Sequence, residues 1–123
     1  MDPERHFSVE RANALLPEVR ERLELLREAN SHIAGHRERV TSVAAGNGGD
    51  PKADEWLDAG RQVAAQLHWF NEEGIVVRDV EQGLIDFPSR REGREIFLCW
   101  RLGEDSVAWW HDTSSGFSGR QPL

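Results

Sequence analysis

The sequence predicts an α+β fold, in which an antiparallel helical hairpin packs on a small antiparallel β-meander. Two observations carry this prediction. Apolar residues recur at helical spacing through residues 9–73, apart from one glycine-rich interruption, and from residue 75 onward they follow strand spacing. Because 123 residues are enough for one hydrophobic core, we expect residues 1–123 to form a single domain.

The first helix of the predicted hairpin begins after Phe7, where Ser8 can cap its N-terminus. A proline ring does not fit a helix interior, so Pro17 predicts a break or kink near Leu16. Beyond the proline, a coiled-coil-like heptad pattern continues to about Ala44. The apolar stripe of this helix consists of Leu16, Val19, Leu23, Leu26, Ile33 and Val40.

The second helix is predicted between the glycine-rich segment 45–50 and Gly74, with Pro51 at its first turn. Its predicted apolar stripe consists of Trp56, Gly60, Val63, Leu67 and Phe70. Two helices with matching stripes and a short link form an antiparallel hairpin, here over about residues 8–73. Because the first helix is longer, its seam around Asn30 either meets another partner and sets the register or faces solvent.

Four strands of the meander are expected within residues 75–111, separated by turn signals that contain glycine or proline. The expected strands span residues 75–80, 84–87, 95–102 and 107–111. The tail, residues 112–123, is expected to be a loop.

The last hairpin is predicted to place Trp100 opposite Trp109 and Leu98 opposite His111. Both faces of the sheet then carry apolar side chains, whereas a sheet covered by helices on one side is usually polar on the other. The tail, a second copy of the chain or a ligand must therefore cover the outer face.

Charge and composition exclude several classes of partner. The net charge of −7 argues against nucleic acids and anionic membranes, which bind proteins with surplus Lys and Arg. No segment approaches the roughly 20 apolar residues that cross a bilayer, and the N-terminus lacks the apolar core of a signal peptide. We therefore expect a soluble, cytoplasmic protein with no membrane partner.

A candidate metal site consists of Asp86 and His111, which are predicted to meet diagonally across the third strand. A carboxylate beside an imidazole can bind a divalent metal or transfer a proton. The competing interpretation is a structural hydrogen bond between the two side chains. Cys99 is interpreted as a small buried hydrophobe, because the predicted register turns His111 to the opposite face.

A second candidate site consists of Arg101, Trp110 and Arg120, which the sequence places at the outer face of the sheet and in the tail. The segment SSGFSGR, with its backbone amides and Arg120, could hold a phosphate or carboxylate. The competing interpretation is an ordered tail that lies over the aromatic face, with Arg120 paired to an acid.

Four motifs, FSVERANALLP, GLIDFP, FLCWRLGE and WWHDTSSGFSGRQPL, together resemble a small bacterial family, domain-of-unknown-function family 2203. The resemblance covers nearly the whole chain apart from the glycine-rich link. It implies a stand-alone bacterial domain and supplies no catalytic residues or ligand.

Two functional hypotheses follow, and they leave open whether the protein is an enzyme. The favoured one is a non-enzymatic, self-associating interaction module, a homodimer formed through the seam from Leu23 to Ile33 or through the aromatic sheet face. The alternative is a small metal-binding protein or metal-dependent enzyme with a site near Asp86 and His111. The small-molecule ligand, the catalytic residues and the reaction remain open.

Overall fold

The computed structural model describes the backbone of residues 6–43 and 53–123 and the side chains of residues 6–35 and 54–123. Within these residues the elements are α1 (Val9–Val43), α2 (Ala53–Glu73), β1 (Val76–Asp79), β2 (Leu84–Arg91), β3 (Arg94–Arg101), β4 (Trp109–Asp112), η2 (Phe117–Gly119) and β5 (Gln121–Pro122). The predicted α+β class, with two packed helices and an antiparallel sheet, is confirmed.

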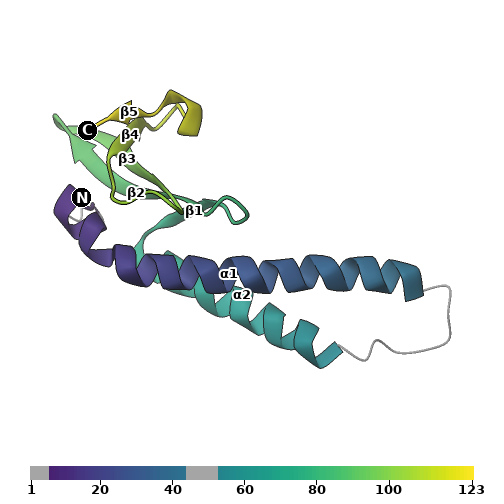
Figure 1. Cartoon of the computed structure of the whole chain (residues 1–123). Helices are drawn as coiled ribbons and strands as arrows, with labels where there is room; N and C mark the ends of the chain where they lie inside the picture. The colour runs from purple at the N-terminus through teal and green to yellow at the C-terminus, as the bar shows by residue number, and fades with distance from the viewer. Residues whose placement is uncertain (1–5, 44–52) are drawn as a thin grey trace.

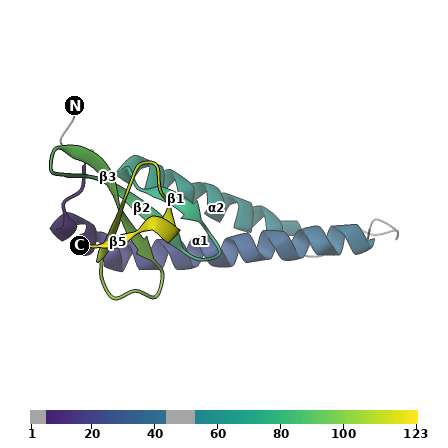
Figure 2. The ribbon, with the colours of Figure 1, turned by 90° about the horizontal axis from the view of Figure 1, so that it is seen from above.

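The sheet lies against one end of the helical hairpin, and the remainder of the hairpin projects beyond it (Figure 1). Figure 2, seen from above, shows the strands over the N-terminal part of α1. No described helix is long and apolar enough to span a membrane. The predicted glycine-rich turn and the predicted helix start at Pro51 lie outside the described residues.

Helix α1 begins at the predicted cap, since the Arg11 backbone N–H donates to Ser8 Oγ at 3.0 Å. Of the predicted break or kink near Leu16, the structure shows the kink, because α1 runs through Pro17 without interruption. Its first turns are inclined to the rest of the helix (Figure 1), as expected at a proline. The helix continues because Ala12 and Val19, on either side of the proline, are both buried in the same core.

Helix α2 ends where predicted, since Gly74 has a positive φ of 81° and the Ile75 N–H donates to the Phe70 carbonyl at 2.9 Å. Its predicted stripe is partly wrong, because Trp56 and Leu67 are exposed by 37% and 41%. The inward-facing residues follow helical spacing back from the core: Phe70, Gln66, Val63 and Ala59.

A glutamine replaces an apolar residue in this interface because its amide group is hydrogen-bonded. Arg22 Nη1 donates to Gln66 Oε1 at 3.2 Å, and Gln66 Nε2 donates to Gln62 Oε1 at 2.7 Å. A buried amide with such partners is tolerated in a helix interface. The heptad pattern could not reveal this, because it ranks residues by hydrophobicity alone.

The strands follow the order β1-β2-β3-β4-β5 and all pairs are antiparallel. Strand β2 is longer than predicted and includes Pro88, although the sequence suggested a turn there. Proline is tolerated because β1 pairs with β2 only as far as Asp86, so Pro88 lies on a free stretch of strand edge. Its carbonyl accepts the Phe7 N–H at 2.7 Å and thereby joins the start of the chain to the sheet.

The predicted register of the last hairpin is wrong by one residue. Cys99 lies opposite Trp109, and Phe97 lies opposite His111. The loop is longer than predicted because Val107 leaves the strand, packs in the core and donates its N–H to Asn13 Oδ1 of α1 at 2.8 Å. A shift of one residue exchanges the two faces of a strand, so Cys99 and His111 share the outer face.

The prediction that the tail is a loop is wrong, because the tail forms regular elements and its Arg120 lies over the outer-face ring of Trp109. It contains η2 and β5, and β5 pairs with β4. The last residue, Leu123, donates its N–H to the Ala108 carbonyl at 2.9 Å. The tail therefore extends the sheet at the β4 edge and covers part of its outer face through Arg120.

Candidate metal centre

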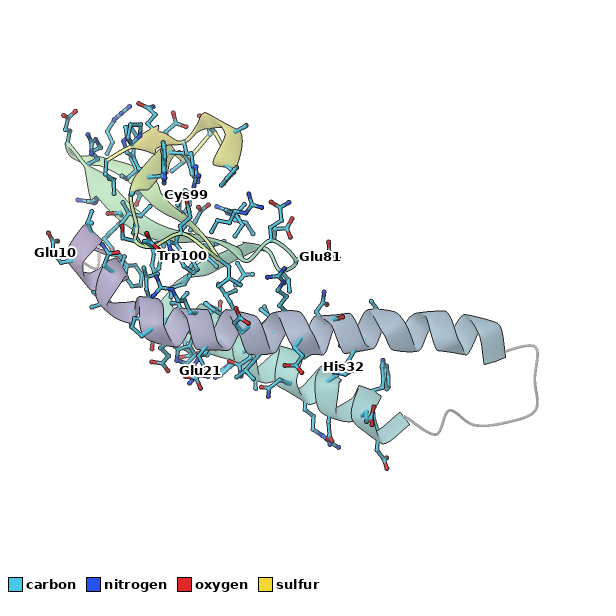
Figure 3. All side chains as sticks on the ribbon, viewed as in Figure 1. Glu10, Glu21, His32, Glu81, Cys99 and Trp100 are labelled. Atoms are coloured by element: carbon cyan, nitrogen blue, oxygen red, sulfur yellow. The ribbon has the colours of Figure 1, made fainter. Side chains whose placement is uncertain are left out.

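Three buried side chains with metal-ligating atoms meet on the outer face of the sheet. Asp86 comes from β2, Cys99 from β3 and His111 from β4, and they are 2%, 1% and 3% exposed. The ligand atoms, one from each residue, all lie within 4.8 Å of one another. Figure 3 shows Cys99 on the side of the sheet away from the helices, whereas Trp100 lies between the sheet and α1.

Strand pairing produces this arrangement. Asp86 is directly opposite Cys99, while His111 is opposite Phe97, two positions further along β3. Residues two apart on a strand point to the same face, so the two strands that flank β3 bring their polar side chains together over it. The predicted diagonal contact between Asp86 and His111 is present in the structure.

Asp86 lies between two groups that can carry positive charge. Arg78 Nε donates to Asp86 Oδ2 at 2.8 Å, and His111 Nε2 lies 3.0 and 3.1 Å from the two carboxylate oxygens. The Arg78 side chain is 44% exposed and reaches the buried acid from the edge strand β1. These partners compensate for the burial of the carboxylate.

The second nitrogen of His111 defines how the ring can act. Nδ1 lies 2.7 Å from the Asp112 carbonyl oxygen. A carbonyl oxygen only accepts, so Nδ1 carries a proton and donates it. Nε2 then faces two carboxylate oxygens, which also accept when ionised. Nε2 and Asp86 can therefore be held together in two ways: by one shared proton or by a metal ion between them.

The Cys99 thiol lies in the same cluster but is not arranged as a nucleophile. Burial, followed by the negative charge of Asp86, raises the pKa of the Cys99 thiol to about 11, while a hydrogen bond from Arg120 acts in the opposite direction. His111 cannot serve as its base, because both ring nitrogens are engaged by oxygen atoms.

We expect the Cys99 thiol of the metal-free native protein to resist alkylation at pH 8. With a pKa of about 11, roughly one thiol in a thousand is ionised at that pH, and the side chain is 1% exposed. Mass spectrometry after iodoacetamide treatment measures the modified fraction, and the urea-unfolded chain is the positive control. Equally rapid modification of the native and unfolded chains would contradict the burial of this thiol.

The structure brings together two of the three residues of the second candidate site, Arg101 and Arg120, but not Trp110. Arg120 lies over the Trp109 and Phe117 rings, with its guanidinium carbon 4.6 and 4.1 Å from their centroids, and pairs with Glu104 at 3.0 Å. Arg101 is near the same Phe117 ring, at 5.9 Å.

Trp110 does not join them, contrary to our prediction. The corrected register turns it toward the helices, where it is 8% exposed and packs in the core. The competing interpretation of an ordered tail, with Arg120 paired to an acid, matches the observed contacts.

Many arginines of this chain lie over aromatic rings. Of the 15 basic residues only Lys52 is lysine. Within the described residues, several arginine guanidinium groups lie 4.1–5.9 Å from the centroid of an aromatic ring. The planar guanidinium can stack on a ring and donate to an acid at the same time, as Arg78 does with Phe97 and Asp86.

Sequence reasoning missed two members of the cluster, Arg78 and Cys99. Cys99 was left out of the cluster because the length of the loop before β4 was underestimated, so that the predicted register turned His111 to the opposite face. Arg78 carried a usable signal: it is a charged residue that follows two valines in a short strand, two positions beyond the residue opposite Asp86. Such a residue on an edge strand is well placed to reach a neighbouring acid.

The fold and the cluster together define the class of the protein: a two-layer α+β domain with a buried Asp–Cys–His group on the sheet face opposite the helices. The chain belongs to the family described as uncharacterized conserved protein (DUF2203), whose model matches residues 5–123. Among curated proteins and among solved structures, none is significantly similar to the chain.

Proposed function

We propose that this protein binds a divalent transition-metal ion of the zinc type through Asp86, Cys99 and His111. The observation that carries the proposal is the convergence of one carboxylate, one thiol and one imidazole, all buried, within 4.8 Å. Thiolate, imidazole and carboxylate are the ligands that zinc selects in proteins. Three protein ligands leave a fourth tetrahedral position for water or a small molecule.

The charge balance of the cluster supports this assignment. Without a metal, Asp86 and His111 share one proton and the Cys99 thiol is neutral, so the three side chains sum to zero. With a dication, the thiol and Nε2 each lose a proton, and the ligands and the ion again sum to zero. A buried site can therefore exchange two protons for one ion without a change in net charge, which avoids the large free energy of burying an unpaired charge.

The groups that hydrogen-bond to the proposed ligands also resemble those of known metal sites. A metal-bound histidine usually donates its other ring N–H to a carbonyl or carboxylate, as His111 does to Asp112. Arg78 donates a hydrogen bond to the carboxylate of Asp86, and Arg120 acts against the rise in the pKa of the Cys99 thiol. The hydrogen bonds orient the proposed metal ligands His111 and Asp86, and Arg120 would stabilise the thiolate form of Cys99.

Titration of the untagged, metal-free protein with Co²⁺ and Zn²⁺ tests the proposal. We expect one ion per chain, a thiolate-to-cobalt charge-transfer band in the near ultraviolet, and a rise in Tm with Zn²⁺. Cys99→Ser should abolish the band. His32→Ala, which alters an exposed histidine on α1, should leave it unchanged. Absence of binding at micromolar protein and a large excess of either ion would reduce the cluster to a buried ion pair.

We propose in addition that the chain self-associates through α2. The seam around Leu23 and Leu26 does not offer a dimer interface, because both residues are 0% exposed in the single chain. Instead, Leu57 and Leu67 on α2 are 46% and 41% exposed, and Gly60 lies between them with open space around its Cα. Apolar residues of this size on one helix face are typical of an interaction surface.

The spacing on α2 is self-complementary. Two copies of α2 can pack antiparallel about a two-fold axis that crosses the helices at the level of residue 62. Leu57 then lies beside the partner's Leu67, and Gly60 lies beside the partner's Ala64. Small residues at the centre allow close approach of the two helices, and the antiparallel helix dipoles attract each other. A two-fold arrangement of this kind uses the same patch on both chains.

Light scattering across micromolar concentrations measures the association. We expect a mass near twice 14.0 kDa for the wild type, and a shift to the single-chain mass for Leu67→Glu, because the charge would be buried in the interface. Leu123→Glu, at a 43% exposed position in the tail, is the matched control and should leave the mass unchanged. A wild-type mass of 14.0 kDa at all concentrations would contradict the proposal.

A further inference from the structure

A cleft separate from the Asp–Cys–His cluster lies between α1 and the turns at one end of the sheet. Its volume is about 600 Å³, within the range of roughly 300–1,000 Å³ that is typical of small-molecule sites. One wall is α1, and the other is formed by the β1–β2 turn and the end of β3. The polar lining residues are Arg27, Asn30, Ser31, Glu81, Gln82 and Arg101.

Opposite charges line this cleft without pairing across it. Arg27 lies on α1, and Glu81 lies at the β1–β2 turn, where Figure 3 labels it. Within the part of the chain that the structure describes, neither side chain forms an ion pair. Arg101 is near the Phe117 ring but likewise pairs with no described carboxylate. The cleft therefore presents two guanidinium groups and one carboxylate to whatever enters it.

The neutral groups between these charges are side-chain amides. Asn30 makes no hydrogen bond to any described residue, although it is half-buried. Gln82 donates weakly to Asp79 Oδ2 at 3.4 Å, which leaves its carbonyl oxygen available. A side-chain amide offers both a donor and an acceptor, which is the complement of a peptide group.

We propose that this cleft binds a short peptide with free termini, of roughly two or three residues given its volume. The terminal carboxylate lies between Arg27 and Arg101, the terminal ammonium pairs with Glu81, and Asn30 and Gln82 bond the peptide groups. A ligand with one negative and one positive charge pairs with both the arginines and Glu81. A purely anionic ligand, such as phosphate or a dicarboxylate, would leave Glu81 unpaired and be repelled by it.

Titration of the full chain with triglycine, followed by ¹H–¹⁵N NMR, tests the proposal. We expect shifts at Arg27, Asn30 and Gln82 that saturate at millimolar concentrations. Arg27→Gln and Glu81→Gln should each weaken binding about fivefold, as expected for a single exposed charged contact. Arg94→Gln, an exposed arginine on the β2–β3 hairpin, is the matched control and should leave the affinity unchanged.

Two further ligands separate the contributions of the charges. N-acetyl-triglycine amide lacks both charges, and succinate has only the negative ones; each should bind at least fivefold more weakly than triglycine. Equal binding of either compound, or no shift of the cleft residues with triglycine, would overturn the proposal.

Discussion

Replacing Asp86 by alanine should lower the free energy of unfolding of the metal-free protein by about 3 kcal/mol or more and abolish metal binding. Removing one partner of a buried ion pair leaves the other charge uncompensated, which typically costs about 3–5 kcal/mol. His111 would lose its acceptor while 3% exposed, and the cavity cannot hydrate it as bulk water does. Urea unfolding followed by tryptophan fluorescence measures the change.

Arg78→Ala is the matched control for this experiment. It removes the other cation beside Asp86, but the Arg78 side chain is 44% exposed, so a loss of only about 1 kcal/mol is expected. An Asp86→Ala variant that unfolds at the same urea concentration as the wild type would show that the pair between Asp86 and His111 contributes nothing to stability.

Replacing Trp100 by alanine should destabilise the fold by about 3–5 kcal/mol, the range for truncating a large buried aromatic side chain. Trp100 is 0% exposed and is the largest fully buried side chain in the described core. Its indole N–H also donates to the Glu104 carbonyl at 3.2 Å, and the same carbonyl accepts from Arg20 of α1 at 3.3 Å. The variant therefore loses packing and part of the link between the β3–β4 loop and α1.

Trp56→Ala provides the comparison, since this side chain is 37% exposed on α2. We expect a loss below about 1 kcal/mol, as for most exposed substitutions. Thermal unfolding of both variants, measured by far-ultraviolet circular dichroism at one protein concentration, would test the difference. Comparable melting temperatures for the two variants would contradict the placement of Trp100 at the centre of the core.

Much of the fold could be predicted because the signals that define it are local. The cap at Ser8, the stop at Gly74 and the change from helical to strand spacing each depend on neighbouring backbone groups. The proximity of Asp86 and His111 was also predictable. Their strands, β2 and β4, both pair with β3, so side chains on the same face of the two strands can meet across it.

The prediction failed where distant segments compete for the same core. The apolar character of Val107 predicted a strand position. In the structure its backbone N–H instead donates to Asn13 Oδ1 of α1, and the register of β4 differs from the predicted one by one residue. That shift decides which side chains of β4 join the site: it places His111 on the same face as Cys99 and sends Trp110 to the core. The number of residues between β3 and β4 does not reveal a hydrogen bond from the intervening loop to a distant helix.

The sequence by itself determined the α+β class, the start of α1 at Ser8, the end of α2 at Gly74, and the family. Each of these follows from periodicity, capping residues or motifs that act over short stretches of chain. The tertiary structure alone decided which face of α2 is buried, how the tail covers the sheet and which three ligands meet. Those choices depend on burial and hydrogen bonding between residues far apart in sequence, where a shift of one residue reverses the face of a whole strand.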